Sequence, residues 1–259
     1  MTQAALFDRL GWCRFALDQA LSDWVAAAWP CAEHLRSDAA QVETWLRCGG
    51  TWFAGVNALP NDAQGAVPGG PPLQGAVVEF LQARFGPQLW DRAQVSVMYP
   101  GYPREMQGES AAAFRFRRDR DAAHVDGLLP EGPQRRRHLR EAHGFVLGLP
   151  LNRTSSEASP MVVWEGSHHL MRDAFAAALA GVAPADWGEV DLTDVYQATR
   201  RACFERCPRV VVHAQPGEAY LIHRLALHGV APWGAEAEDA LRMIAYFRPE
   251  LPDIADWLG

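Results

Sequence analysis

The stretch PGEAYLIHRLALHGVAPW, residues 216–233, combines a strand-like pattern with two histidines in different settings. In EAYLIH the side chains of an extended chain alternate between two faces, which puts Leu221 and His223 on the same face. That explains His223 as an ordinary strand residue. His228 follows in LHGVAPW, where Gly229 and a proline mark an irregular turn. Because such connections carry functional residues more often than strands do, His228 is the stronger ligand candidate.

Short β-branched or aromatic runs, bounded by Pro, Gly or Asn, recur from about residue 93 to 250. Each has the length of a strand, and many short strands are typical of an antiparallel sandwich or jelly roll. A helical insert interrupts them at about residues 170–205. The strands expected besides EAYLIH are AQVSVMYP (93–100), AAFRFR (112–117), HGFVLGLPL (143–151), PMVVWE (160–165), RVVVHA (209–214) and LRMIAYFR (241–248).

The first third of the chain has a helical periodicity instead. Apolar residues three and four apart occur in residues 15–29, 31–46 and 72–85. Helices gathered at one end of a series of short strands predict a mainly β fold with helices (α+β), in which the strands pack against N-terminal helices. We expect a single domain over residues 1–259, with a helical part at about 1–92 and a strand core at about 93–250.

The composition is that of a globular protein. The 259 residues are 49% hydrophobic, which is enough for a substantial core. With 31 acidic against 24 basic residues, the formal net charge of −7 argues against nucleic acid or an anionic membrane as a partner. The five cysteines form no CxxC pair, and no run approaches about 18 apolar residues. We therefore expect reduced thiols, no membrane span and a cytoplasmic location.

A second candidate site lies in RDAAHVDGLL, residues 120–129. On an extended chain His124 and Asp126 project from the same face. The pair could be a solvated surface pair, or two of three protein ligands of a metal. Two His and one carboxylate on one side of the ion hold Fe(II) in non-heme oxygenases and leave positions open for other ligands. If His228 is the third ligand, it follows Asp126 by 228 − 126 = 102 residues.

An ordered series of segments strengthens the metal interpretation. HVD is followed by SPMVVWEGSHH (159–169), then by the stretch of residues 216–233, and finally by LRMIAYFRPE (241–250). In this order the segments resemble the phytanoyl-CoA dioxygenase-like family of Fe(II)/2-oxoglutarate-dependent oxygenases. The resemblance covers the second part of the chain and is weaker in the helical first 90 residues. It implies a double-stranded β-helix of the jelly-roll, cupin-like type and a 2-oxoglutarate-dependent oxidation.

The resemblance also implies roles for single residues. His124, Asp126 and His228 match the three iron ligands, and their donor set suits Fe(II) with a chelating α-keto acid. Arg242, 14 residues after His228, matches the arginine that pairs with the distal carboxylate of 2-oxoglutarate, whereas Arg248 fits a surface arginine better. The family often has a hydroxyl two positions after this arginine, but Ile244 stands there. Another residue must complete the carboxylate site, and the candidates on the strand before HVD are Gln94, Ser96 and Tyr99.

The substrate prediction depends on AAFRFR. If this run is a strand, Arg115 and Arg117 share one face just before His124 and could attract an anion to the metal. We therefore expect a small or medium-sized substrate with a carboxylate or phosphate group, and Arg117 as its first anchor. The alternative is a solvated arginine face. Trp164 is either a core residue or a wall of the substrate pocket.

The predicted activity is that of a hydroxylase, which consumes O2 and 2-oxoglutarate and releases succinate and CO2. Halogenases of similar fold lack the carboxylate ligand, so Asp126 argues against halogenation. Two alternatives stay open. One is a nucleic-acid demethylase, because RMIAYFR places two arginines six positions apart as those enzymes do. The other is a non-catalytic binding or sensing module on the same fold. Small molecules and O2 are the expected partners.

Overall fold

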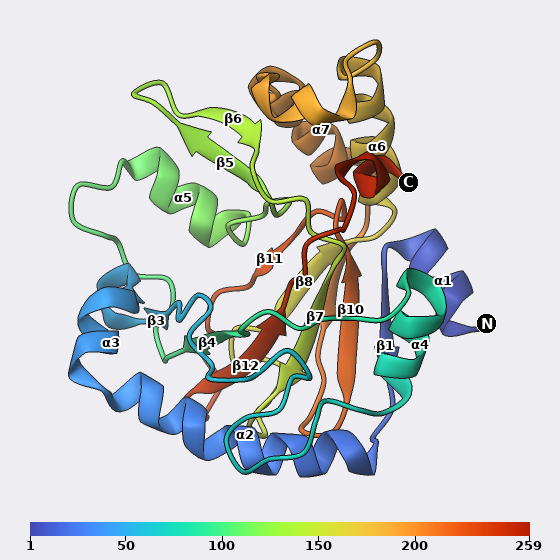
Figure 1. Cartoon of the computed structure of the whole chain (residues 1–259). Coiled ribbons are helices and arrows are strands. Elements are labelled where there is room, and N and C mark those ends of the chain that lie inside the picture. The colour runs from blue at the N-terminus through green and yellow to red at the C-terminus, as the bar shows by residue number, and fades with distance from the viewer.

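The structure is a computed structural model that describes residues 1–259 (Figure 1). Its largest element is a seven-stranded sheet in the order β1-β10-β7-β12-β4-β3-β2, with every neighbouring pair antiparallel. Three of its strands come from the N-terminal part of the chain, and four from the second part. The strands are β1 (Trp12–Phe15), β2 (Leu46–Arg47), β3 (Trp52–Phe53), β4 (Gln94–Met98), β7 (Phe145–Pro150), β10 (Ala219–His223) and β12 (Arg242–Phe247).

A three-stranded sheet, in the order β11-β8-β9, packs against the inner face of the large sheet. It consists of β8 (Met161–Trp164), β9 (Arg209–Val212) and β11 (His228–Val230). One buried cluster joins the two sheets, with Met161, Val163 and Val212 from the small sheet and Val146 and Ile244 from the large one. The predicted jelly-roll architecture is confirmed.

Helices cover the outer face of the large sheet (Figure 1). Alternation along β12 sends Met243, Ala245 and Phe247 into the core beneath these helices, while Ile244 and Tyr246 face the small sheet. The N-terminal helices that contribute to this covering layer are α1 (Gln3–Leu10), α2 (Gln19–Ser37), α3 (Ala39–Trp45) and α4 (Ala76–Phe85). None of the helices has the length and apolar character required to cross a bilayer.

The predicted helical insert forms a separate layer near the C-terminus. It comprises α6 (Ser167–Ala178), a 3-10 turn (Pro184–Glu189) and α7 (Thr193–Arg206), and the final 3-10 turn (Ile254–Leu258) packs on it. A second core cluster lies here, and it contains Phe175, Tyr196 and Trp257. This layer packs on the small sheet, because Val162 and Trp164 of β8 belong to the same cluster.

One strand prediction is wrong. The run AAFRFR lies in helix α5 (Ala111–Asp119), where the Ser110 side chain accepts a hydrogen bond from Ala113 N and caps the helix. Four residues of alternating Phe and Arg are too short to identify a strand, and the preceding alanines favour a helix. Residues two apart on a helix point in nearly opposite directions, so Arg115 and Arg117 do not share a face. All other predicted strands are observed.

A hairpin, the strand β11 and the three N-terminal strands β1, β2 and β3 were not predicted from the sequence. Strands β5 (Leu128–Glu131) and β6 (Arg136–Leu139) form an antiparallel pair directly after HVD. Its arginines look like a charged loop in the sequence, because only the paired Leu128 and Leu139 are buried in the core. The turn predicted around His228 is the short strand β11, which pairs with β8. Pairing therefore fixes the backbone of His228 more firmly than a turn would.

Candidate metal centre

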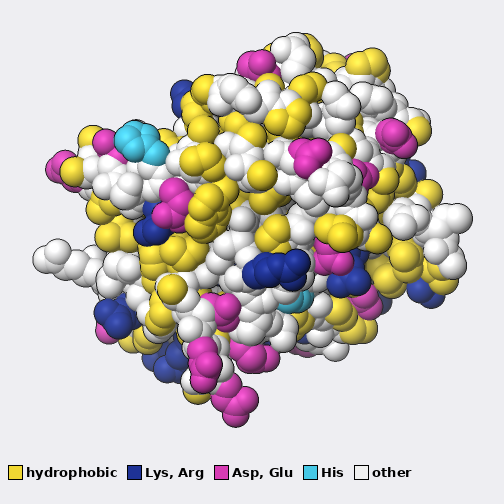
Figure 2. Space-filling view, turned by 90° about the horizontal axis from the view of Figure 1, so that it is seen from below, with side chains coloured by type: hydrophobic (Ala, Val, Ile, Leu, Met, Phe, Trp, Pro, Cys, Tyr) yellow, Lys and Arg dark blue, Asp and Glu magenta, His cyan; other side chains and the backbone are white.

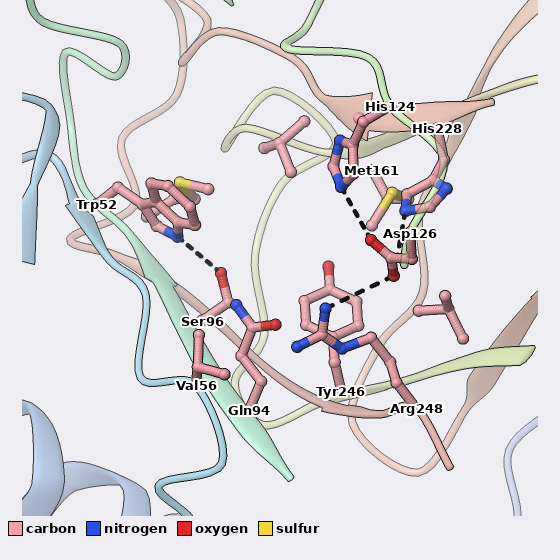
Figure 3. Close-up of a pocket in the computed structure, with 14 residues that line it drawn as sticks. Trp52, Val56, Gln94, Ser96, His124, Asp126, Met161, His228, Tyr246 and Arg248 are labelled. Atoms are coloured by element: carbon pink, nitrogen blue, oxygen red, sulfur yellow. Dashed lines mark hydrogen bonds and ion pairs between the residues drawn. The ribbon is translucent and has the colours of Figure 1, made fainter. Parts of the chain in front are cut away.

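Three predicted ligands meet at one end of the jelly roll (Figure 3). His124 and His228 form an isolated antiparallel bridge, in which each backbone N–H donates to the other's carbonyl, at 2.8 and 3.0 Å. Asp126 follows two residues later on the same segment. One ligand atom from each of the three side chains lies within 4.8 Å of the other two. His223, the competing histidine, is not part of this group.

The hydrogen bonds of the two imidazoles assign their tautomers. His124 Nδ1 donates to Ala122 O at 3.0 Å, and His228 Nδ1 donates to Ala226 O at 2.9 Å. The Nε2 lone pairs of neutral rings therefore point inward, where they approach the Asp126 carboxylate at 3.2 and 3.9 Å. With both rings neutral, three electron-pair donors face one another, an arrangement that a cation bound between them would satisfy. The donor set fits a divalent transition metal.

The protonation states also suit a metal. Burial lowers the pKa of His228 to about 4, against the opposing effect of Asp126, so this ring is neutral near pH 7. Burial raises the pKa of Asp126, but its contacts with His124, His228 and the Arg248 guanidinium outweigh burial and hold the pKa well below its usual range. Metals bind neutral imidazole and ionised carboxylate, so these two side chains need no proton release before they coordinate.

The segment before the ligands is held by an ion pair whose carboxylate is buried. Arg209 on β9 donates two hydrogen bonds to Asp121, at 2.7 and 2.8 Å, and only 6% of the Asp121 side chain is exposed. Val230 N donates to Asp121 O on the other side of the segment. A Cβ at Gly229 would lie 2.2 Å from that same oxygen, so glycine is required for this close approach. These contacts fix the segment that carries His124 and Asp126 against strands β9 and β11.

Arg242, the first residue of β12, is buried inside the barrel with 4% of its surface exposed. Its Nη2 donates to the hydroxyls of Tyr246 at 3.2 Å and Tyr220 at 3.4 Å. Its Nη1 is buried and has no hydrogen-bond partner, and Arg242 makes no ion pair. A buried guanidinium without a counter-charge is costly, so this site fits an anionic group supplied from outside the chain.

The candidates on β4 and directly after it divide between the two faces of the strand. Gln94 and Ser96 line the inner cavity beside the three ligands (Figure 3). Gln94 Nε2 donates to Ala54 O at 2.9 Å, and Ser96 Oγ accepts from Trp52 Nε1 at 3.1 Å. Tyr99 lies outside this cavity, packs against the core under the helices and has Arg36 as its polar neighbour. Odd-numbered residues of β4 point away from the cavity, and Tyr99 continues this alternation, which accounts for its position.

Arg248 is a site residue that the sequence interpretation placed on the surface. It lines the cavity, only 20% of its side chain is exposed, and Nη1 lies 3.6 Å from Asp126 Oδ2 (Figure 3). Tyr246 lines the same cavity. Arg248 and Tyr246 are an even number of residues from Arg242, so alternation along the last strand puts all three on the same face. This pattern in the sequence could have identified them.

The predicted substrate residues do not come together. Arg115 is exposed on α5. Arg117 lines the outer cavity, but its guanidinium is paired with Glu109 and contacts Cys48 Sγ. Trp164 is 3% exposed and packs edge-on against Phe204 in the second core cluster, away from both cavities. Of the two alternatives for Trp164, its position is that of a core residue and not of a pocket wall.

Two connected cavities adjoin the ligands. The inner one has a volume of about 210 Å³ and contains Gln94, Ser96 and Tyr246. The outer one has a volume of about 620 Å³ and extends toward α3, α5 and the β5–β6 hairpin. Both share His124, Asp126 and Arg248 in their lining. A small group bound in the inner cavity and a larger one in the outer cavity would therefore meet at His124 and Asp126, whereas His228 lines only the inner cavity.

The chain was compared with known proteins. No protein-family model and no curated protein matches it. Among solved structures it resembles SnoN, a non-heme α-ketoglutarate-dependent epimerase from nogalamycin biosynthesis, with a TM-score of 0.51 and 16% identity over 95% of this chain and 80% of that chain. It also resembles EctD from S. alaskensis, crystallised with 2-oxoglutarate and 5-hydroxyectoine, with a TM-score of 0.50 and 18% identity over 95% and 74%. At these identities the likeness shows the fold alone.

Proposed function

We propose that the chain is an Fe(II)/2-oxoglutarate-dependent dioxygenase that hydroxylates a small or medium-sized anionic substrate and releases succinate and CO2. The observation that carries this proposal is the coexistence of two unsatisfied sites in one barrel. One is the cluster of inward lone pairs on His124, Asp126 and His228, and the other is the unpaired guanidinium of Arg242. A metal alone would satisfy only the first site, whereas a metal with a chelating dicarboxylate satisfies both.

Iron would be held by His124 Nε2, His228 Nε2 and the Asp126 carboxylate. Two nitrogen donors with one carboxylate on one side of the ion form the ligand set of non-heme Fe(II) oxygenases. When bound, iron, O2 and 2-oxoglutarate supply an oxidant that removes hydrogen from an unactivated carbon. The presence of Asp126 favours hydroxylation over halogenation, because the carboxylate occupies the position that a halide would need.

The chain's contribution to cosubstrate binding is a preformed carboxylate site. Arg242 would pair with the distal carboxylate of 2-oxoglutarate, and the hydroxyls of Tyr246 and Tyr220 already contact its guanidinium. These hydroxyls replace the one that Ile244 lacks. Gly148 makes room for them, because a Cβ there would lie 2.3 Å from the Tyr220 ring. Ser96 and Gln94 line the inner cavity together with Tyr246, whose hydroxyl accepts a hydrogen bond from Arg242; Arg242 itself lies behind this lining.

Arg248 and the apolar lining would prepare the site for the reaction. The Arg248 guanidinium lies 3.6 Å from Asp126 Oδ2, where its charge favours the ionised carboxylate. Val146, Met161 and Val230 give the inner cavity an apolar lining that limits water beside the metal. A lower local dielectric strengthens the pairing between an arginine and a carboxylate, which favours a bound keto acid over one that is free in water.

Anaerobic absorption spectroscopy with Fe(II) and 2-oxoglutarate tests this proposal. We expect the weak visible charge-transfer band of a chelated α-keto acid, and its loss in Asp126→Ala. His34→Ala is the matched control, because His34 is an exposed histidine on α2. A wild-type protein without the band would contradict the proposal. Because SnoN is an epimerase, product analysis by mass and chirality should separate hydroxylation from isomerisation.

The alternatives give different results in the same assays. A sensing module would bind Fe(II) and 2-oxoglutarate but would release no succinate under air. A nucleic-acid demethylase would need a basic surface for the phosphate backbone. The face in Figure 2 mixes acidic, basic and hydrophobic side chains without a continuous basic band, and the net charge is −7. Both features favour a small-molecule substrate.

A further inference from the structure

The outer cavity has the volume and the lining of a substrate site. Its volume of about 620 Å³ falls within the usual range for organic ligands. Apolar and aromatic side chains form one part of the lining, namely Trp45, Trp52, Met98, Tyr102 and Met106. The β5–β6 hairpin and the segment before it contribute another part. A ligand with an apolar body could therefore lie between these elements with one end at His124.

Acidic side chains in this lining are already paired. Asp121 accepts two hydrogen bonds from Arg209, and Glu141 lies 3.1 Å from His143 Nε2. Asp126 belongs to the metal cluster. None of these three carboxylates is available to neutralise a cation elsewhere in the cavity.

Five arginines line the same cavity, and two of them have acidic partners. Arg117 pairs with Glu109, and Arg248 lies beside Asp126. The remaining three, which are Arg47, Arg135 and Arg137, make no ion pair. The cavity therefore carries uncompensated positive charge in a protein whose formal net charge is −7.

Arg137 is the least accessible of these three and the most firmly placed. Its backbone N–H donates to Thr193 Oγ1 at 2.6 Å, and Nη1 donates to Leu128 O at 2.7 Å. Its guanidinium lies 5.8 Å from the centre of the Tyr196 ring. Burial lowers the pKa of Arg137, and the neighbouring charges of Arg200 and Arg135 lower it further, against the opposing effect of Tyr196. A half-buried cation in this setting is stabilised by an anion.

We propose that Arg137 binds the anionic group of the substrate, a carboxylate or a phosphate monoester, while the apolar body of the substrate lies against Trp52 and Met98 with its reacting carbon toward His124. The reaction in this statement rests on the proposed function, but the binding does not require iron. Arg137 replaces Arg117 as the anchor, since Glu109 already neutralises Arg117. Arg47 and Arg135 attract the anion at the cavity entrance.

Calorimetry with matched probes tests this assignment. The probes are 4-phenylbutanoate, 3-phenylpropyl phosphate and the neutral 4-phenylbutanamide, titrated into metal-free protein and into anaerobic protein loaded with Fe(II) and 2-oxoglutarate. We expect at least one anionic probe to bind tenfold or more tightly than the amide. Comparison of the two anions identifies the preferred group. Equal binding of all three probes, or no binding by any of them, would overturn the proposal.

Substitutions then connect the preference to Arg137. Arg137→Met keeps an unbranched apolar stem without charge and should reduce the preference for the anion to less than twofold, whereas Arg137→Lys should retain part of it. Arg115→Met, on the exposed face of α5, is the control and should change nothing. An undiminished preference in Arg137→Met would refute the assignment. If that variant misfolds, Arg137→Gln replaces it with the same expected loss of preference, and a salt titration of the wild type shows that the preference is electrostatic.

This experiment separates the two proposals. Anion binding to metal-free protein with no spectral band in the iron experiment would leave the Arg137 site standing and remove the oxygenase. A normal band with equal binding of acid and amide would support the oxygenase and remove the Arg137 site.

Discussion

Two pairs of histidines in this molecule have nearly the same spacing but different surroundings. The ring centroids of His124 and His228 are 4.7 Å apart, and those of His168 and His223 are 4.9 Å apart. Burial lowers the pKa of His228 and of His168 to about 4 in both cases. Each pair therefore has two close imidazoles, of which burial keeps at least one neutral, and this property alone does not define a metal site.

The pair His168 and His223 lacks two further features of a metal site, which are converging lone pairs and a carboxylate beside them. His168 Nε2 donates to Asp8 O at 3.0 Å, and His223 Nδ1 accepts from Leu225 N at 3.1 Å. No carboxylate joins these rings in a metal-binding group, and a Cβ on Gly11 would lie 2.5 Å from His168 Nδ1. A metal site needs lone pairs that converge with a carboxylate beside an open cavity, and only the first pair has this arrangement.

Each region also contains a buried arginine. Arg224, next to the second pair, donates to the carbonyls of Gly144, Asp256, Trp257 and Gly259. Arg242 instead has an Nη1 without any partner. The first guanidinium is satisfied by the chain and fastens its C-terminal turn, whereas the second is left for a ligand.

The largest expected effect distinguishes the histidines within one stretch of sequence. His228→Ala should abolish detectable Fe(II) binding, a loss greater than the roughly 10–100-fold cost of removing a residue that only orients a ligand. His223→Ala should leave the affinity within twofold. Anaerobic competition titration against a chromophoric chelator measures both. Strong iron binding by His228→Ala would transfer the role to another side chain.

The arginines provide the second contrast. Arg242→Met should weaken 2-oxoglutarate binding by about 2–5 kcal/mol, because a buried carboxylate loses its partner. Iron binding and folding should be retained. Arg224→Met should instead lower the free energy of unfolding by about 2–4 kcal/mol, since several carbonyls lose their donor. Anaerobic spectral titration and urea denaturation of both variants separate the two outcomes, and a destabilised Arg242→Met that binds 2-oxoglutarate normally would reverse the assignment.

The sequence predicted those parts of the site that depend on local pattern. His124 and Asp126 share a face because they are two apart, and parity along the last strand could also have identified Arg248 and Tyr246. The helix α5 was missed because a run as short as Phe-Arg-Phe-Arg fits more than one period. Pairing across long distances, such as Asp121 with Arg209, leaves no local signal in a single sequence.

The charge state of the second pair supplies a pH test. The pKa of His168 falls from an unfolded value of about 6.5 to about 4 in the folded protein. Between these values the unfolded chain takes up a proton that the folded protein does not, so the stabilisation is complete above pH 6.5 and decreases as pH falls toward 4. The loss should be roughly 2.5 kcal/mol at pH 4.5.

Urea denaturation at pH 7.5 and 4.5 measures this loss. His168→Gln removes the titrating ring, so its stability should fall less on acidification than that of the wild type, by about the same 2.5 kcal/mol. His34→Gln is the exposed control and should follow the wild type. An identical pH dependence in His168→Gln would show that another group is responsible.

The smallest expected effect concerns the hydroxyl that Ile244 does not provide. Tyr246→Phe removes a hydroxyl that contacts Arg242 Nη2 at 3.2 Å and the Tyr220 hydroxyl at 2.9 Å. Because this is a neutral group, 2-oxoglutarate binding should weaken by only about 0.5–1.5 kcal/mol. Tyr196→Phe, which removes a buried hydroxyl from the second core cluster, should leave that affinity unchanged. Unaltered binding in Tyr246→Phe would mean that Ser96 or Gln94 on the neighbouring strand β4 supplies the polar contact to the carboxylate. The position of Tyr246 on the inner face of β12 would then reflect packing alone.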